Sequence, residues 1–370
     1  MIFRAPGKKG VNMVKFYSLK NILSKNARYN VILGERSNGK TYSVLKYALE
    51  SYVKTGKQLA IVRRWREDFT GKRGASMFDS LTANNEISRL TGGEWSGVYY
   101  FSSRWYLCRH DGDKRITDEK PFAYGFAVSA GEHDKSTSYP DITTILFDEF
   151  LTRTGYIPDE FVLFMNVVST IVRHRTDVKI FMLGNTVNKY CPYFNEMGLT
   201  HIKEMKPGSI EVYKYGESDL TVAVEYTAPA KKGKGSDIYF AFNNPKLQMI
   251  TGGAWEIDIY PHCPMKILPR HIIFKYYILF DGDSLECDIV NGEEFMFTFI
   301  HRKTTVIKDP ENEIIYSSEF SPYPNHHRKI TKGESKLEKK IAWFFKNDKV
   351  YFSDNEVGEI VYNYLKWCNQ

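Results

Sequence analysis

Short apolar-rich runs, each followed by polar residues, recur along the first half of the chain. They cover residues 29–33, 58–62, 142–147 and 178–183. Runs of this length without regular alternation are typical of strands buried on both faces of a parallel sheet. Residues 158–173 place apolar side chains three and four positions apart, and residues 42–53 form a second helix-like stretch. The first half of the chain is therefore predicted to be an α/β unit.

Residues 94–128 have a different pattern. Aromatic-rich segments of a few residues flank a turn sequence at residues 110–114, which is typical of short antiparallel strands joined by hairpins. We interpret them as an antiparallel addition to the α/β unit. Further along, Pro and Gly accumulate in residues 206–253, with a Lys- and Gly-rich stretch at residues 228–235. This composition indicates a connector or small linker domain.

The last third of the chain has its own order of predicted elements. Strands are expected at residues 271–280, 285–290 and 294–300, weaker strands near 304–308 and 314–320, a helix at 334–346, a strand at 349–353 and a helix at 356–366. A strand meander followed by helix, strand and helix is the order of an α+β RNase H-like nuclease. We therefore expect three parts, at residues 1–205, 206–253 and 254–370.

A nuclease of that type needs carboxylates that converge on two metal ions. The first strand of the meander has no acid, Asp281 and Asp283 fit a hairpin turn, and only Asp354 stands at a strand end. We expect this domain to be a vestigial nuclease without the cutting chemistry. The basic run at residues 326–329, with further lysines up to Lys340, fits either a phosphate-backbone contact or a solvated helix face.

The residues between the first apolar run and the first helix match the phosphate-binding motif G-x-x-x-x-G-K-[ST] completely. They read Gly34-Glu35-Arg36-Ser37-Asn38-Gly39-Lys40-Thr41. Backbone N–H groups of such a turn and the positive end of the following helix hold phosphate oxygens, the lysine reaches the outer phosphates, and the hydroxyl ligates magnesium. The stretch is predicted to bind ATP together with Mg²⁺.

The run at residues 142–147 ends in two acids, Asp148 and Glu149. On such a strand the first acid holds magnesium beside Thr41, and the second orients and polarises the water for in-line attack. Two successive acids downstream of a complete phosphate loop favour ATP hydrolysis over a merely charged strand end. The second acid indicates the additional-strand, catalytic-glutamate branch of the P-loop NTPases.

Other polar residues stand at the ends of the same predicted strands. The second run is followed by three arginines, Arg63, Arg64 and Arg66. This edge of an α/β sheet is where ligands bind, so one of these arginines could act at the nucleotide or at a neighbouring subunit. The alternative is that the cluster is a solvated turn. Asn185 ends the fourth run and is either a sensor of the γ-phosphate and the attacking water or an ordinary turn residue. Tyr17, upstream of the first run, either stacks on adenine or belongs to the core.

The predicted helix at residues 158–173 is followed by the motif Arg173-His174-Arg175 at its end. Arginine at a helix end is either a solvated cap favoured by the helix dipole or an arginine finger that stabilises transition-state charge on an adjacent subunit's nucleotide. The spacing by itself leaves both readings open.

Composition narrows the range of partners. A chain of 370 residues, 42% hydrophobic and 26% charged, suits two or more folded units. The net charge of +7 permits a nucleic-acid partner without requiring one.

Five cysteines without C-x-x-C spacing favour a reducing compartment over a disulfide framework or a zinc site. Neither an apolar leader nor a run of about eighteen apolar residues is present, so neither a signal peptide nor a membrane span is expected.

Together these motifs resemble the DNA-packaging (encapsidation) ATPases of phi29-like short-tailed bacteriophages, which are compact relatives of terminase large subunits. The resemblance rests on Phe16-Tyr17 before the phosphate loop, Val62-Arg63-Arg64, Lys135-Ser136 before Tyr139-Pro140, residues 144–150, Arg173-His174-Arg175, and Asn185 ahead of Asn188 and Pro192-Tyr193-Phe194. It is specific over about residues 15–200 and concerns only element order beyond them.

The resemblance implies an ATPase domain, a small linker domain and an inactive nuclease-like domain. It implies a homo-oligomeric ring, typically a pentamer, on the portal of an empty prohead in the host cytoplasm, with double-stranded DNA and in some phages a structural packaging RNA as partners. Arg173 matches a finger acting in trans, Lys135 lies in a segment that assists across the interface, and Arg66 stands where the family has a basic residue near the nucleotide.

The sequence thus predicts a viral motor subunit that hydrolyses ATP to move double-stranded DNA into a preformed capsid. A DNA helicase or translocase would share every ATPase motif but act on free DNA. A terminase large subunit with an active nuclease would need the missing strand carboxylate. A nucleotide-dependent switch would hydrolyse ATP slowly and ignore DNA.

Overall fold

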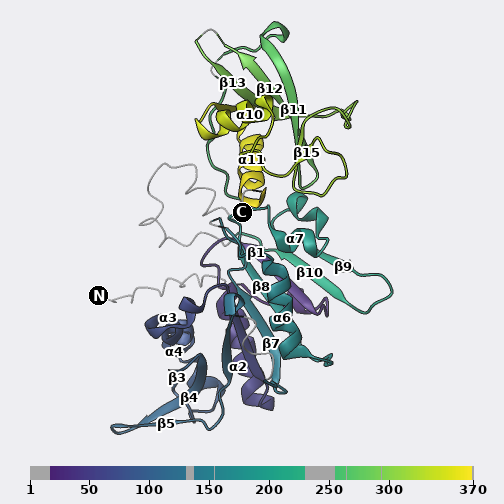
Figure 1. Ribbon diagram of the computed structural model, residues 1–370. Helices are drawn as coiled ribbons and strands as arrows, with labels where there is room; N and C mark the ends of the chain where they lie inside the picture. Colours follow the sequence, from purple (N-terminus) through teal and green to yellow (C-terminus); the bar gives the residue numbers. More distant parts are fainter. Residues whose placement is uncertain are drawn as a thin grey trace, which may run out of the picture. The chain divides into compact units, whose positions relative to one another are not determined.

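The computed structural model describes residues 17–130, 137–153, 155–229, 255–263, 265–292 and 294–368. The chain divides into two compact units, Met1–Trp255 and Glu256–Gln370 (Figure 1). The N-terminal arm, Lys135 and the second half of the expected connector lie outside the described residues.

A ten-stranded sheet forms the centre of the first unit. Its spatial order is β3 (Gly97–Phe101), β4 (Arg104–Asp111), β6 (Ala123–Ala127), β2 (Gln58–Arg63), β7 (Ile142–Asp148), β8 (Lys179–Asn185), β1 (Tyr29–Gly34), β10 (Thr221–Tyr226) and β9 (Ile210–Lys214), with β5 (Lys114–Thr117) paired to β4. The six strands from β6 to β10 are mutually parallel. The predicted α/β class is confirmed, and the apolar runs form its central strands.

Helices cover both faces of this sheet, which explains why its central strands lack polar alternation. On one face, Phe147 of β7 packs against Phe164 of α6 (Glu160–Val172), with ring centroids 4.7 Å apart. The preceding residue, Leu146, belongs to a second core that includes the buried side chains of α2 (Lys40–Thr55). Adjacent strand residues point to opposite faces, so both must be apolar here.

The position of β8 determines the geometry of the strand ends. It pairs with β1 on one side and with β7 on the other. The strand before the phosphate loop and the strand that ends in the two acids are therefore second neighbours. Because all three are parallel, the phosphate loop, the acids and Asn185 gather at one edge of the sheet.

The antiparallel addition is confirmed for β3, β4 and β5, which form hairpins. Residues 122–126 lie largely in β6, which pairs antiparallel with β4 as expected but also pairs in parallel with β2, and β6 therefore belongs to the central sheet. A short apolar strand has no local feature that separates a parallel partner from an antiparallel one.

The expected boundary at residue 205 also differs from the structure. β10 follows it and pairs in parallel with β1, and β9 then closes the sheet as an antiparallel edge. Five of the six residues of β10 are buried. The first unit thus includes the beginning of the expected connector. Two strands in this segment were not predicted, because its composition is rich in turn residues.

The second unit contains a six-stranded sheet. Its order is β15 (His326–His327), β14 (Ile315–Ser317), β11 (Ile272–Phe280), β12 (Asp283–Asn291), β13 (Met296–Arg302) and β16 (Val350–Phe352), with helices α10 (Lys336–Lys346) and α11 (Asn355–Cys368). The antiparallel meander β11–β12–β13 and the turn at Asp281 agree with the prediction. Residues 304–308 do not form the weak strand that was expected.

One face of the meander packs on α11, with Phe280 against Tyr364. The alternate positions carry charge: Glu286, Asp288 and His301 offer ligand atoms within 4.8 Å of one another. Lys275 bonds to Glu286, and Lys303 Nζ lies 2.7 Å from the same carboxylate. These two acids of β12 were not among the residues predicted from the sequence. No described helix of either unit is long and apolar enough to cross a membrane.

Candidate nucleotide-binding and catalytic site

The phosphate-loop motif forms the turn between β1 and α2. Ser37 and Gly39 have positive φ angles of 59° and 92°, and the second would strain most side chains, which explains the glycine. A Cβ on Gly34 would collide with the Thr227 hydroxyl just beyond β10. The Asn38 amide donates a hydrogen bond to that same hydroxyl, at 3.1 Å. The residue that follows strand β10 therefore packs against the phosphate loop and supports it.

Lys40 opens α2 with only 5% of its surface exposed. Its Nζ donates to the carbonyl oxygens of Gly34 and Glu35, at 3.2 and 2.7 Å, and lies 3.4 Å from Asn185 Oδ1. Burial lowers the pKa of Lys40 to about 8, although the Asp148 and Glu35 carboxylates oppose the shift. The predicted phosphate lysine and the predicted sensor thus lie in one cluster.

Thr41 and Asp148 meet across the sheet edge. The Thr41 hydroxyl donates to Asp148 Oδ1 at 3.1 Å. Burial raises the pKa of Asp148, and the adjacent Arg63 guanidinium opposes this shift. A hydroxyl and a carboxylate at hydrogen-bond distance are the hard oxygen donors that Mg²⁺ takes in nucleotide sites, so the predicted metal pair fits that ion.

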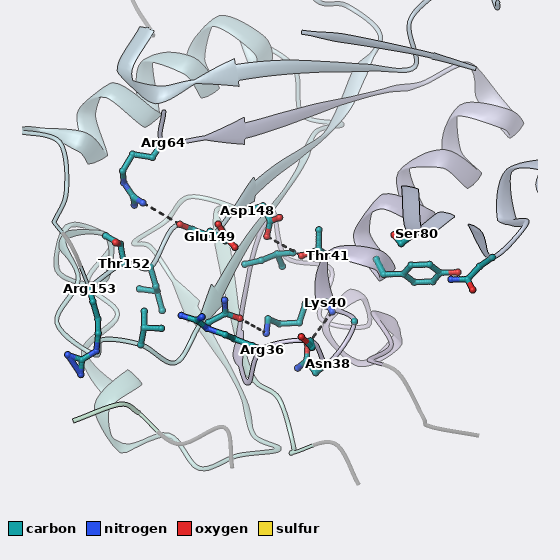
Figure 2. Close-up of a pocket in the computed structure, with 18 of the residues that line it drawn as sticks. Arg36, Asn38, Lys40, Thr41, Arg64, Ser80, Asp148, Glu149, Thr152 and Arg153 are labelled. Atoms are coloured by element: carbon teal, nitrogen blue, oxygen red, sulfur yellow. Dashed lines mark hydrogen bonds between the residues drawn. The ribbon is translucent and has the colours of Figure 1, made fainter. Parts of the chain in front are cut away.

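Glu149 lies immediately after β7 with a positive φ of 61°. This left-handed conformation is uncommon for a residue with a side chain. It turns the carboxylate away from the sheet, and 61% of the side chain is exposed. Its Oε2 accepts a hydrogen bond from Arg63 Nη1 at 2.6 Å. The second acid therefore faces the open space beside the phosphate loop (Figure 2).

Arg63, the last residue of β2, and Arg64 and Arg66 after it have three different environments. Arg63 binds both acids, with Nη2 also 2.8 Å from Asp148 Oδ2. Arg64 is buried and forms a two-pronged ion pair with Glu160, each N–O distance being 2.8 Å. Arg66 begins a 3₁₀ turn and lines a separate groove with Arg104. Arg63 thus binds the two carboxylates of the acidic pair, whereas Arg64 Nη1 donates to the main-chain oxygen of Glu149 at 3.4 Å.

A cavity of about 960 Å³ lies at this edge of the sheet (Figure 2). It is lined by Arg36, Ser37, Asn38, Gly39, Lys40, Thr41, Tyr42, Arg64, Ser80, Asn84, Glu86, Asp148, Glu149, Leu151, Thr152, Arg153, Leu183, Asn185 and Val187. Arg153 was missed, although a cation four residues after the acid pair was a usable signal. The lining residues between positions 80 and 86 had no such sequence signal, because they are distant from every motif along the chain.

Tyr17 lies beneath the phosphate loop and is absent from the residues that line the cavity. Its N–H donates to Asn38 O at 3.0 Å, and its hydroxyl donates to Glu225 Oε2 at 2.5 Å. Burial raises the pKa of Tyr17 and that of Glu225. Tyr17 thus braces the loop, and its stacking on adenine stays a prediction.

Arg173 is located far from this cavity. Helix α6 begins at Glu160, beside Arg64, and runs back along β7, so its 13 residues place its far end about 20 Å away. Arg173 caps that end, exposed and with a positive φ of 51°. An arginine at the opposite edge of the sheet does not reach the nucleotide pocket of its own chain.

Residues 11–206, slightly more than half of the chain, match the family model of the podovirus DNA encapsidation protein (Gp16). The chain belongs to this family. The DNA packaging protein of Bacillus phage phi29 is 27% identical over 182 residues, which are 48% of this chain and 49% of that protein. The counterpart in Bacillus phage B103 is 28% identical over 183 residues, 48% of this chain and 50% of that protein. The chain thus matches about half the length of these encapsidation proteins.

Two solved structures resemble the whole chain. The Phi-28 gp11 DNA packaging motor is 19% identical, with 96% of this chain and 98% of that chain covered and a TM-score of 0.53. The bacteriophage Phi-29 genome packaging motor assembly is also 19% identical, with coverages of 94% and 98% and a TM-score of 0.54. At this identity the likeness concerns the fold, and it extends over both units of this encapsidation-family chain.

Proposed function

We propose that this protein is an ATP-hydrolysing motor subunit that packages double-stranded DNA into a preformed phage capsid. The observation that carries the ATPase part is the arrangement of Thr41, Asp148 and Glu149 beside a complete phosphate loop, with Thr41 Oγ1 3.1 Å from Asp148 Oδ1. Membership of the encapsidation family supports the packaging part.

The proposed chemistry divides among residues of this edge. Lys40 and the loop N–H groups bind the phosphates. Thr41 and Asp148 hold Mg²⁺, which neutralises charge on the phosphate oxygens when it is bound. Glu149, exposed toward the cavity, orients and polarises the attacking water, and Asn185 contacts the γ-phosphate or that water.

The strand order supports the additional-strand, catalytic-glutamate branch of P-loop NTPases. One strand, β8, is inserted between the phosphate-loop strand and the acid strand. For the second unit, the meander β11–β12–β13, with β14 parallel to β11, supports the RNase H-like interpretation. We infer that this unit is catalytically inactive, since the nearby acids are paired with lysines.

The remote position of Arg173 supports its action in trans. Each pocket then lacks one transition-state charge until a neighbouring subunit docks, which is a physical reason for a homo-oligomeric ring. We propose a pentamer on the prohead portal in the host cytoplasm, with Lys135 assisting at the interface. The net charge of +7 is compatible with DNA and with a packaging RNA.

The test is the steady-state ATPase rate of purified protein with and without double-stranded DNA. DNA should raise the rate of the wild type, and Glu149→Gln should abolish hydrolysis while ATP still binds. Arg173→Ala should also keep ATP binding but lose roughly 10³-fold or more in hydrolysis, the scale of an arginine finger. His174→Ala changes an exposed neighbour and is the matched control.

The other outcomes separate the alternatives. Hydrolysis that ignores DNA would replace the motor by a nucleotide-dependent switch. Translocation on free DNA without proheads would favour a helicase or translocase. Cleavage of DNA with Mn²⁺ would indicate a terminase with an active nuclease. Undiminished hydrolysis in Arg173→Ala would remove that residue from the site.

A further inference from the structure

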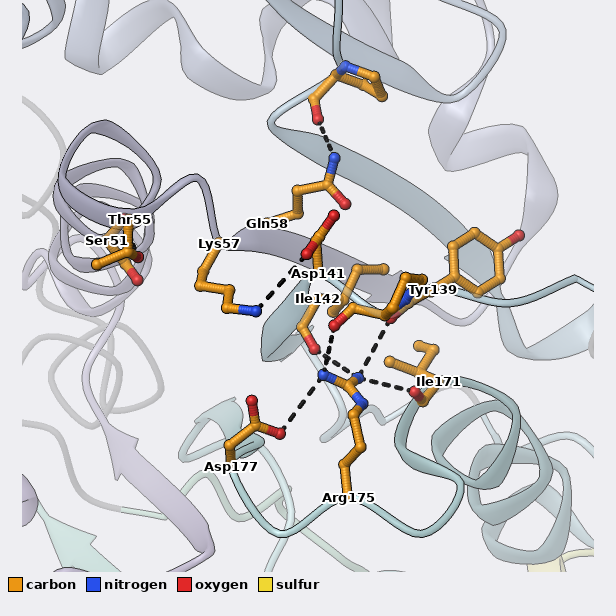
Figure 3. Close-up of polar contacts among 12 residues, drawn as sticks. Ser51, Thr55, Lys57, Gln58, Tyr139, Asp141, Ile142, Ile171, Arg175 and Asp177 are labelled. Atoms are coloured by element: carbon orange, nitrogen blue, oxygen red, sulfur yellow. Dashed lines mark hydrogen bonds and ion pairs between the residues drawn. The ribbon is translucent and has the colours of Figure 1, made fainter.

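Arg175 binds a cluster of backbone carbonyl groups at the edge of the sheet opposite the nucleotide cavity (Figure 3). Its Nη2 lies 2.6 Å from Ile142 O, 2.9 Å from Ile171 O and 3.2 Å from Tyr139 O. Its Nη1 lies 3.0 Å from Pro140 O. The side chain is 25% exposed and is thus mostly enclosed by these groups. The guanidinium joins the last turn of α6 to the segment that leads into β7.

Arg173 depends on the same segment. Its Nη2 donates to Thr137 O at 3.1 Å, two residues before the first carbonyl that Arg175 binds. Its main chain ends α6 through an N–H bond to Ser169 O at 2.9 Å, and Arg175 N–H bonds to Val172 O at 3.0 Å. Residues 137–142 therefore form a common support for both arginines.

The main chain of Arg173 is in a sparsely populated conformation, with φ 51° and ψ −118°. Such a conformation persists only where surrounding contacts enforce it. Arg175 is two residues away, and its guanidinium contacts four backbone carbonyl oxygens around this helix end. Without it, the end of α6 is free to relax, and the exposed Arg173 guanidinium moves with it.

We propose that Arg175 is a positioning residue that holds Arg173 in the geometry needed to reach a neighbouring subunit's nucleotide. The inference rests on the proposed function, because it assumes that Arg173 acts in trans. Arginine suits this task, since its planar fork directs several N–H groups at once, whereas a lysine ammonium is a single point donor. Of the two arginines in the motif, one presents charge and the other fixes its position.

The first experiment measures ATP binding and hydrolysis of Arg175→Ala and Arg175→Lys. Both variants should bind a fluorescent ATP analogue as the wild type does, because their own pocket is at the far end of α6. Hydrolysis should fall by roughly 10²-fold in Arg175→Ala, the scale of a catalytic group displaced by about 1 Å. Arg175→Lys should lie between that variant and the wild type.

Lys57→Ala is the matched control at the same edge. Lys57 pairs with Asp141 at 3.6 Å, and both side chains are substantially exposed (Figure 3). Removing it takes one positive charge from the neighbourhood of residues 137–142 without touching the carbonyl cluster. Hydrolysis by this variant should equal that of the wild type. A loss similar to that of Arg175→Ala would make general charge, rather than the cluster, responsible.

The decisive experiment mixes each variant one to one with Glu149→Gln before assembly. A ring built at random places an intact pocket next to an intact Arg173–Arg175 pair at about a quarter of its interfaces. A single-turnover measurement of phosphate release detects one hydrolysis event at each interface, so it does not require the ring to complete its cycle. Arg175→Ala mixed with Glu149→Gln should release phosphate much faster than either protein does alone.

A misfolded variant gives no such rescue, because the Arg175→Ala subunit must itself supply the working pocket. Arg173→Ala mixed with Glu149→Gln is the reference. If the reference mixture stays inactive, the trans assignment of the proposed function fails. If the reference recovers and the Arg175 mixtures do not, or if both Arg175 variants hydrolyse like the wild type, the positioning role is overturned.

Discussion

Arg63 and Asp148 form an ion pair beside the phosphate loop, with Nη2 2.8 Å from Oδ2 and 17% and 6% of the two side chains exposed. The other terminal nitrogen of Arg63 binds Glu149 at 2.6 Å. One cation therefore compensates both acids of the site. This relationship makes the magnesium dependence of nucleotide binding sensitive to a residue that does not line the cavity.

Arg63→Ala should weaken ATP binding in the presence of EDTA and much less in the presence of Mg²⁺. Without the arginine, two uncompensated carboxylates face the phosphates, and a charge pair at short range contributes on the order of a few kcal/mol near a protein surface. We expect the affinity for ATP to fall by roughly tenfold or more in the absence of metal. Fluorescence titration with an ATP analogue measures both conditions.

Arg66→Ala is the control for that experiment, because it removes the same charge from a neighbouring residue that lines a different groove. Its affinities should match those of the wild type in both conditions. Equal losses in Arg63→Ala with and without Mg²⁺ would contradict the prediction.

ATP binding should become weaker as the pH rises through about 8. Burial lowers the pKa of Lys40 to about 8, so the side chain is mostly charged at pH 7 and mostly neutral at pH 9. Phosphates bind the charged form, and binding near pH 8 should therefore take up protons. Calorimetry in two buffers with different ionisation enthalpies measures this uptake. Lys40→Arg, which stays charged, should abolish it, and uptake that persists in that variant would assign the effect elsewhere.

Arg64→Met should destabilise the first unit strongly. Arg64 and Glu160 form a buried pair, with 8% and 0% of their side chains exposed. Glu160 also accepts hydrogen bonds from the Tyr193 hydroxyl and from Ile157 N–H. Breaking a buried pair leaves an uncompensated charge, which costs about 3–5 kcal/mol. Urea unfolding measures the loss.

Lys57→Ala removes an exposed ion pair in the same unit and should cost less than about 1 kcal/mol. If the two variants unfold at similar urea concentrations, the buried pair does not contribute the proposed free energy of unfolding. The double variant Arg64→Met/Glu160→Leu should recover part of the loss, since no buried charge is left unpaired.

The second unit should neither bind Mn²⁺ tightly nor nick plasmid DNA. Glu286, Asp288 and His301 are close enough to hold an ion, but the Lys275 and Lys303 ammonium groups occupy the Glu286 carboxylate. Displacing two cations opposes metal entry. Nicking assays with the whole chain test this, and Glu286→Gln is the control. Cleavage that disappears in Glu286→Gln would restore an active nuclease.

The phosphate loop and the acid pair could be recognised from the sequence because each is contiguous. The turn geometry of residues 34–41 arises from neighbours along the chain, and the acids directly follow their strand. The meander of the second unit was predictable for a similar reason, since tight turns join consecutive strands. The missed strand β10 and the parallel direction of β6 depend on partners more than about thirty residues away, and β9 joins the sheet only through β10.

By itself the sequence determined that an α/β unit carries a phosphate-loop turn and a strand that ends in two successive acids, because periodicity and local turn chemistry encode them. Only the tertiary structure separated residues of identical chemistry. Arg63 binds the acids while Arg64 is buried against Glu160, and Arg173 is exposed while Arg175 binds carbonyl groups. Adjacent side chains on a strand or at a helix end point in different directions, so each meets groups that were brought there by distant parts of the chain.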